Sequence, residues 1–194
     1  MGHKHHGKSS ADFLDADEIL SEFNFNGNEV FLDAGCGDGY ISIKAIEEYI
    51  PDGIVYAVDA YDESIKGLEE YKQENNIENL VNIEADLTKT IPAIEDSSVD
   101  VVFMLNVFHG FTSQNQDDVI QELIRVIKDN GKITIMDFKP FDMQKGPPTD
   151  IKKSPEELEE IFNNHGLNKV YLNEEIGEDL PEGKSHYLII FEKE

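Results

Sequence analysis

The residues best suited to chemistry form a glycine-rich turn, Asp33-Ala34-Gly35-Cys36-Gly37-Asp38-Gly39. Its alternating glycines let the backbone turn tightly and lie against a ligand without an intervening Cβ. The dinucleotide pattern G-x-G-x-x-G needs a glycine at position 40, where the chain has Tyr40. The two aspartates would also repel a diphosphate, whereas they suit a ligand that carries a positive charge. The candidate ligand contacts in this turn are Asp33, Gly35, Cys36, Gly37 and Gly39.

Polar residues also follow the next apolar segments. Asp59, with Ala60 beside it, lies about twenty residues after the turn, where an acid accepts hydrogen bonds from ribose hydroxyls. Asp86 and Leu87 follow the third apolar segment, and there a carboxylate can accept from an exocyclic amine while a leucine packs on the ring. Asn106 follows the fourth. Each signal is weak alone, but their order and spacing together indicate one nucleoside site.

Short apolar runs alternate with amphipathic stretches along the chain, which predicts strands alternating with helices. We expect strands at residues 30–33, 54–58, 81–85, 99–105, 132–138, 169–173 and 186–192. We expect helices at residues 11–23, 40–49, 63–75, 117–128 and 154–165. The apolar character of residues 99–105 predicts a strand buried on both faces.

This alternation predicts an α/β fold with three layers, in which helices cover both faces of a mostly parallel sheet of seven strands. No helix separates the last two strands, so they should pair as a hairpin, and the last strand should run antiparallel. We expect residues 1–28 to form an N-terminal segment with a lid helix, and residues 29–194 to form a single domain.

From Val30 onward the chain resembles the class I S-adenosylmethionine-dependent methyltransferases. The resemblance rests on FLDAGCGDG at residues 31–39, Asp59 in VYAVDA, Asp86 in EADL, and DVVFMLNVFHG at residues 100–110. It implies a Rossmann-like methyltransferase fold, S-adenosyl-L-methionine as cofactor, and methyl transfer to a small-molecule acceptor. Within the family the chain is most similar to the branch of quinone-biosynthesis and arsenite methyltransferases. The arsenite branch holds its substrate with several cysteines, whereas this chain has only Cys36.

Catalytic candidates should lie where the fourth and fifth strands end, at Asn106, Phe108, His109, Asp137 and Lys139. Because the last strand runs the opposite way, its first residues, His186 and Tyr187, should reach the same rim. His109 is the first candidate for a general base or substrate ligand, and His186 is the second. The alternatives are a half-buried loop histidine bonded to backbone and a solvated strand end. Asn106 is expected to serve the amino-acid end of the cofactor through its carbonyl.

The net charge of the chain limits the classes of partner that it could bind. The 194 residues include 41 acidic and 16 basic residues, a net charge of −25, so the surface should repel nucleic acid. The acidity serves solubility or, alternatively, attracts a cationic ligand. The one arginine, Arg125, is expected at the surface of its helix. We expect no resident metal, although His3, His5 and His6 could be a tag remnant, a tail, a lid or metal ligands together with His109 or His186.

The remaining predictions concern location and class. No apolar run approaches the roughly 20 residues of a membrane helix, and one cysteine excludes an intramolecular disulfide framework. A cytoplasmic protein with no membrane partner is therefore expected. The alternative to an enzyme is a non-catalytic S-adenosylmethionine-binding sensor, or the partner subunit of another methyltransferase. A nicotinamide oxidoreductase is disfavoured by Tyr40.

Overall fold

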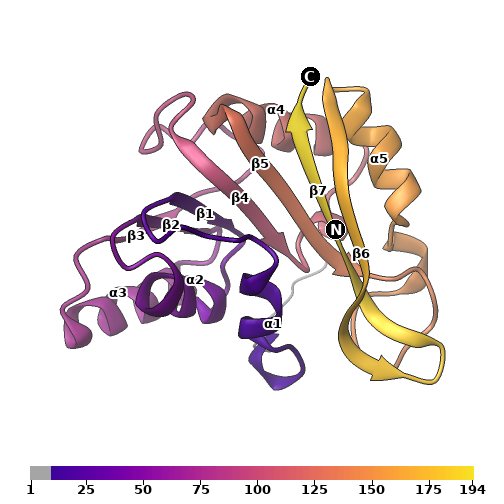
Figure 1. Ribbon diagram of the computed structural model, residues 1–194, viewed down its shortest axis with the longest axis horizontal. Coiled ribbons are helices and arrows are strands. Elements are labelled where there is room, and N and C mark those ends of the chain that lie inside the picture. Colours follow the sequence, from indigo (N-terminus) through magenta and orange to yellow (C-terminus); the bar gives the residue numbers. More distant parts are fainter. Residues whose placement is uncertain (1–9) are drawn as a thin grey trace.

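The computed structural model describes residues 10–194 (Figure 1). His3, His5 and His6, with the roles considered for them, therefore lie outside the described residues. Seven strands form one sheet in the order β3-β2-β1-β4-β5-β7-β6. The strands are β1 (Val30–Ala34), β2 (Ile54–Asp59), β3 (Leu80–Glu84), β4 (Val99–Leu105), β5 (Ile127–Phe138), β6 (Leu167–Leu180) and β7 (Gly183–Lys193). The helices are α1 (Ala16–Ser21), α2 (Tyr40–Lys44) continued by a π-helical turn (Ala45–Tyr49), α3 (Asp62–Asn75), α4 (Gln116–Val126) and α5 (Pro155–Asn163).

Strand directions confirm the mostly parallel sheet. β1 pairs in parallel with β2 and β4, β2 with β3, and β4 with β5. β7 runs antiparallel to both of its neighbours, β5 and β6, as the missing helix between the last two strands predicts. Strand order reverses between β1 and β4, so the loops after these two strands diverge at the carboxyl edge of the sheet.

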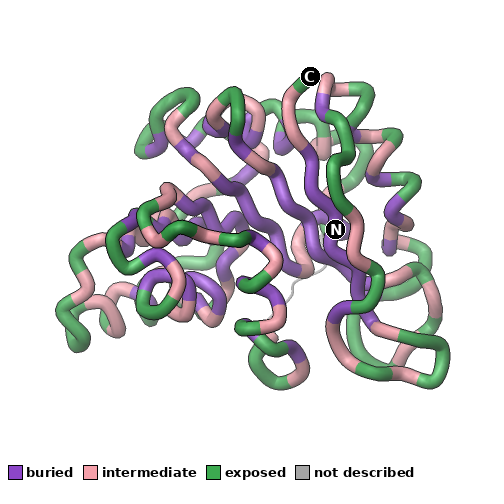
Figure 2. Tube along the Cα trace, viewed as in Figure 1, coloured by how far each residue is buried: buried purple, intermediate pink, exposed green. Residues whose placement is uncertain are grey.

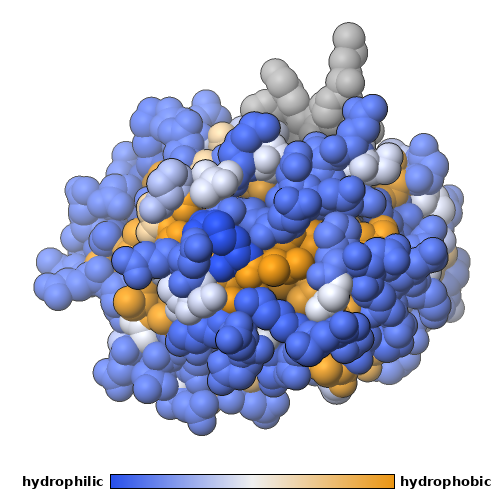
Figure 3. Space-filling view, turned by 90° about the horizontal axis from the view of Figure 1, so that it is seen from above, coloured by the Kyte–Doolittle hydropathy of each residue, from blue (hydrophilic) through white to orange (hydrophobic). Residues whose placement is uncertain are grey.

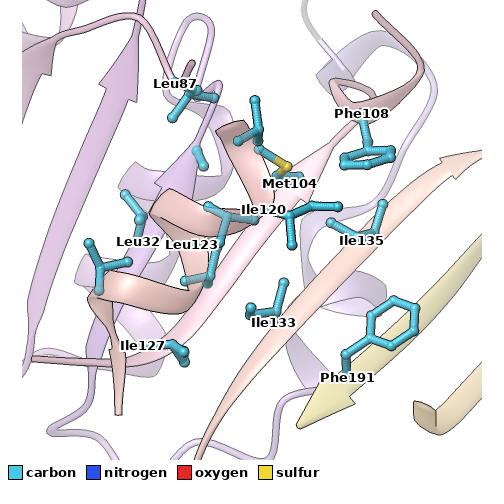
Figure 4. Close-up of a cluster of buried hydrophobic side chains, with 14 of the residues drawn as sticks. Leu32, Leu87, Met104, Phe108, Ile120, Leu123, Ile127, Ile133, Ile135 and Phe191 are labelled. Atoms are coloured by element: carbon cyan, nitrogen blue, oxygen red, sulfur yellow. The ribbon is translucent and has the colours of Figure 1, made fainter. Parts of the chain in front are cut away.

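The core lies on both faces of the sheet, because side chains alternate along each strand. On one face, α4 and α5 pack over Leu32, Met104 and other strand residues (Figure 4). On the other face, α1, α2 and α3 pack over Phe31 and Phe103. The central strands are buried along most of their length (Figure 2). The three layers expected from the sequence are therefore confirmed, and β4 matches residues 99–105 at both ends.

The N-terminal helix differs from its prediction over residues 11–23. A 3₁₀ turn (Ser10–Asp12) precedes a shorter α1, because Asp15 adopts extended backbone angles and its side chain accepts from the N–H of Asp17. The Tyr40 hydroxyl joins the two pieces, since it donates to Leu14 O and accepts from Ala16 N. Tyr40, which the sequence presents only as a missing glycine, thus ties the N-terminal segment to α2.

Arg125 is partly exposed on α4, with 23% of its side chain accessible, and its hydrogen bonds give it a structural role that the sequence did not predict. Its guanidinium donates to the buried carboxylate of Glu122, to the carbonyls of Ile91 and Ile94, and to Asp96. Glu122 in turn accepts from the N–H of Ile91. Arg125 therefore fastens the segment before β4 onto α4, and the planar fork of arginine supplies the several donors this needs.

The surface is strongly polar. Seen from above, hydrophilic side chains cover most of the molecule, and hydrophobic ones gather in recessed areas between them (Figure 3). Within residues 10–194, each helix is too short or too polar to cross a lipid bilayer.

Candidate functional site

The glycine turn lies directly after β1 and is anchored on β2. The N–H groups of Gly35 and Cys36 both donate to the carbonyl of Val58, at 2.7 and 3.0 Å. The N–H of Gly37 donates to the Asp59 carboxylate at 2.9 Å. Two of the sequence-predicted elements, the turn and the acid that ends the second strand, are therefore in direct contact.

All three glycines of the turn have left-handed backbone angles, but their surroundings differ. A Cβ on Gly35 would lie 2.4 Å from a methyl carbon of Val107, and one on Gly39 would lie 2.1 Å from a methyl carbon of Leu68. A Cβ on Gly37 would meet nothing within 4 Å. Gly35 and Gly39 are thus required for packing, whereas Gly37 borders open space where a ligand could approach the backbone.

Asp59 is buried, yet its carboxylate keeps acceptor capacity. One oxygen accepts from Gly37 N and the other from Tyr61 N, each at 2.9 Å. A carboxylate offers about four lone-pair sites, so roughly two stay available to ligand hydroxyls. Ala60 is exposed beside it.

Asp86 and Leu87 lie beyond β3 on the same edge of the sheet. One oxygen of Asp86 accepts from the backbone N–H and the hydroxyl of Thr88, and these hydrogen bonds lower the pKa of the Asp86 carboxyl. The exposed Asp86 is therefore held ionised as an acceptor. Leu87 is buried, with its side chain in the core beneath the loop (Figure 4).

Asp33 and Cys36 lie deeper than the glycines. The Asp33 carboxylate accepts from the Ser42 hydroxyl at 2.6 Å, which ties β1 to α2. Burial, with a smaller contribution from the nearby charge of Asp59, raises the pKa of Asp33 to about 7. Burial likewise raises the pKa of the Cys36 thiol, so this cysteine stays protonated and unreactive.

The raised pKa of Asp33 predicts a specific pH dependence of stability. Between about pH 4 and pH 7 the folded chain holds a proton on Asp33 that the unfolded chain has lost, so its contribution to stability decreases as pH rises. Between pH 5 and pH 8, Asp33→Asn should flatten the profile by about 3 kcal/mol, because about two pH units of the shift fall in this range. Urea unfolding of both proteins at pH 5 and pH 8 measures the difference. Parallel profiles for the two proteins would contradict the prediction.

His109 and Asp137 form a buried pair at the ends of β4 and β5. The ring Nδ1 of His109 lies 2.7 Å from one carboxylate oxygen of Asp137, and its backbone N–H donates to the other at 3.0 Å. This arrangement gives the ring a carboxylate partner rather than the backbone partner of the alternative considered from sequence. Phe108 does not face the site as expected, because its ring packs in the core against Phe162.

His186 reaches the same rim from β7 and is also fully buried. Its Nε2 lies 2.9 Å from the side-chain oxygen of Asn106, and its Nδ1 lies 2.6 Å from the hydroxyl of Ser185. Because an amide oxygen only accepts, Nε2 carries the proton and Nδ1 accepts from Ser185. Burial lowers the pKa of His186 to about 4, so the ring is neutral at pH 7.

Asn106 has a left-handed backbone angle, φ 59°, although it is not a glycine. Such strain persists where the surroundings hold it, and it is common at functional sites. Here the N–H of Asn106 donates to Met136 O and its side chain accepts from His186. The side-chain oxygen is therefore engaged, while the amide nitrogen stays available as a donor.

The carboxyl edge thus brings together the turn, the acids after β2 and β3, Asn106, and the histidines. Sequence reasoning missed the partners that hold them: Ser42 under Asp33, and Ser185 beside His186. Ser185 is adjacent to His186 and Ser42 lies nine residues after Asp33, and serines at such positions are too common to be singled out from sequence. Among residues 10–194, no three His, Cys, Asp or Glu side chains are grouped as metal ligands.

Comparisons with known proteins show the family and the fold of the chain. A family described as "Methyltransferase domain" matches residues 25–193. An uncharacterised methyltransferase-like protein of Schizosaccharomyces pombe is 32% identical over 120 residues, which cover 62% of this chain and 42% of that protein. An arsenite methyltransferase of Halobacterium salinarum is 30% identical over 131 residues, which cover 67% of this chain and 32% of that protein. The chain thus spans less than half the length of these curated relatives.

Among solved structures, a SAM dependent methyltransferase from Aquifex aeolicus superposes with a TM-score of 0.80 at 25% identity. The superposition covers 95% of this chain and 93% of that one. The fold is therefore shared over nearly the full length of that protein.

Proposed function

Because the chain belongs to the methyltransferase domain family, we propose that it transfers a methyl group from S-adenosyl-L-methionine to a small-molecule acceptor. The observation that carries this proposal is the contact between Gly37 N and Asp59, at 2.9 Å beside open space. It joins a bare backbone edge to a carboxylate with acceptor capacity, the combination that a nucleoside ribose requires.

The residues of the carboxyl edge fit the cofactor. Asp59 would accept from the ribose hydroxyls, and Asp86 with Leu87 would receive the adenine. The backbone around Gly37 would lie against the nucleoside, with Ala60 next to the ribose. The other residues of the turn would hold its backbone in shape: Asp33, Gly35, Cys36 and Gly39. When bound, the cofactor supplies a methyl group activated by its sulfonium charge.

The acceptor side would be served by the two buried histidines. Asp137 holds the ring of His109, and with the proton on Nδ1 it would be Nε2 that accepts a proton from the acceptor. His186 would act through Asn106, because it holds the Asn106 oxygen and leaves the amide N–H groups to bind an oxygen atom. In this assignment His109 is the catalytic residue and His186 is a positioning residue.

A small-molecule acceptor is favoured by the charge of the chain, which disfavours a nucleic acid partner. Arsenite is a weak candidate, since the one cysteine, Cys36, is buried in the turn. Closure of the site by the N-terminal segment is part of the proposal, supported by Phe13, whose ring contacts His186. The cytoplasmic location stays a prediction.

The proposal is tested by calorimetric titration with S-adenosylhomocysteine and by transfer of labelled methyl groups into a small-molecule extract. Asp59→Asn should weaken S-adenosylhomocysteine binding about tenfold or more, because hydrogen bonds to a charged acceptor are lost. Asp52→Asn, at an exposed loop position, is the matched control and should leave binding unchanged.

No binding at millimolar nucleoside would end the proposal. Binding without label transfer would instead favour the sensor or partner-subunit alternative. Urea unfolding of Asp59→Asn shows whether a loss of binding comes from the site or from a loss of the fold.

A further inference from the structure

A cleft of about 450 Å³ adjoins the histidine rim, and its lining combines aromatic rings with carboxylates. We propose that this cleft binds the acceptor, and that it selects a molecule in which a positively charged nitrogen is joined to an apolar ring. This inference rests on the proposed function and deepens it by naming the chemical class of the acceptor. The charged nitrogen serves for recognition, and the methyl group need not be transferred to it.

The apolar part of the cleft is aromatic. The rings of Phe13 and Phe138 lie 6.3 Å apart between centroids and are inclined by 25°, and the His186 ring lies 4.3 Å from that of Phe138. Met143 and Leu180 extend the apolar lining. Flat apolar groups pack favourably on such surfaces, so a ring in the ligand matches this wall.

The chain already places an ammonium group in the cleft. Lys145 Nζ lies 5.4 Å from the centroid of the Phe13 ring and 2.9 Å from the Glu178 carboxylate. An aromatic face together with a carboxylate is a favourable site for a cation. Lys145 therefore occupies the position that we assign to the charged nitrogen of the ligand, and it is replaced when the ligand binds.

The charge balance of the cleft favours a cation over an anion. Glu178 is paired with Lys145, whereas Asp142 and Glu182 form no ion pair within residues 10–194. The Lys152 ammonium lies over the Phe138 ring and donates a hydrogen bond to Phe141 O. Its positive charge offsets part of the negative charge of these carboxylates. The lining still carries more carboxylates than ammonium groups, and a carboxylate ligand would be repelled.

Hydrogen bonds connect the cleft to the proposed site of methyl transfer. The N–H of Glu178 donates to Ser185 Oγ, Ser185 contacts His186, and His186 contacts Asn106 at the end of β4. Three hydrogen bonds therefore link the backbone of Glu178 to the side chain of Asn106. In the proposal, the recognition group of the ligand lies near Glu178 and its reacting group points toward Asn106.

The test uses two probes of the same shape and opposite charge, 2-phenylethylamine and 3-phenylpropanoate. Each is titrated calorimetrically into the full chain saturated with S-adenosylhomocysteine at pH 7. The amine should bind about tenfold more tightly than the acid, and added salt should reduce the difference.

Lys145→Gln distinguishes this proposal from the opposite hypothesis, in which Lys145 binds an anionic ligand. Removal of the resident ammonium should strengthen amine binding about threefold, because the Phe13 site becomes free. Lys66→Gln, an exposed lysine on α3, makes the same change in net charge away from the cleft and should leave amine binding unaltered.

The inference is overturned if the acid binds as tightly as the amine, if neither probe binds, or if Lys145→Gln leaves amine binding unchanged or weaker. An equal gain in Lys66→Gln would overturn it too, since the effect would then arise from net charge alone. S-adenosylhomocysteine binding is measured first, so its absence identifies a failure of the proposed function instead.

Discussion

His109→Gln should lower the rate of methyl transfer by about two orders of magnitude while nucleoside binding stays within about twofold. The Asp137 carboxylate holds the His109 ring at 2.7 Å and fixes which nitrogen is basic. Glutamine can keep the hydrogen bond to Asp137 but cannot accept a proton near neutral pH. The loss therefore falls on turnover, measured as label transfer from S-adenosyl-L-methionine, and not on the calorimetric affinity for S-adenosylhomocysteine.

His165→Gln is the matched control for this prediction. Its ring is held by Ile161 O and Asp117, away from the His109 pair, so turnover should be unchanged. A rate for His109→Gln within about threefold of the unsubstituted protein, against the large loss expected of a missing base, would rule out the assigned role. A loss that falls on turnover and leaves the affinity for S-adenosylhomocysteine unchanged would support it.

Gly39→Ala should destabilise the fold by about 4 kcal/mol and lower the melting temperature by roughly 10 °C. Gly39 has φ +79°, where an L-residue is strained, and its added Cβ would lie 2.1 Å from a carbon of the buried Leu68. The backbone strain and the steric overlap with Leu68 would therefore both arise at Gly39, where the turn packs against α3. Thermal unfolding followed by circular dichroism measures the effect.

Two other glycines make this prediction specific. Gly67→Ala, within α3 and with nothing within 4 Å, should stabilise the chain by about 0.5–1 kcal/mol. Gly37→Ala meets open space, so it should cost less stability than Gly39→Ala and weaken nucleoside binding more. Equal losses at Gly37 and Gly39 would contradict the division between a packing glycine and a ligand-facing one.

Much of the architecture could be predicted because its causes are local. The segment Val99–Leu105, apolar except for Asp100, needs burial on both faces, and it forms the central strand β4. The glycine turn needs left-handed angles that few other residues adopt, and all three of its glycines have them. The absence of a helical pattern between the last two strands likewise predicted the antiparallel hairpin.

Element ends were harder to predict where the apolar pattern is weak. β6 continues to Leu180, well past the expected residue 173, because it pairs with β7 along a polar edge of the sheet. α1 begins only at Ala16, because the Tyr40 hydroxyl and the Asp15 cap together define its start. Both ends depend on partners that lie elsewhere in the chain.

The sequence alone was sufficient for the fold class, for the turn, and for the positions of the acids that end β2 and follow β3, since each follows from a short pattern and the geometry of parallel strands. Only the tertiary structure decided which partners the histidines contact. His186 meets Asn106 across 80 residues, and His109 meets Asp137 across 28. Phe108 turned inward for the same reason, and Arg125 binds the buried carboxylate of Glu122. The direction of a side chain at a strand end depends on loop angles and on partners from distant segments, and no local pattern encodes either.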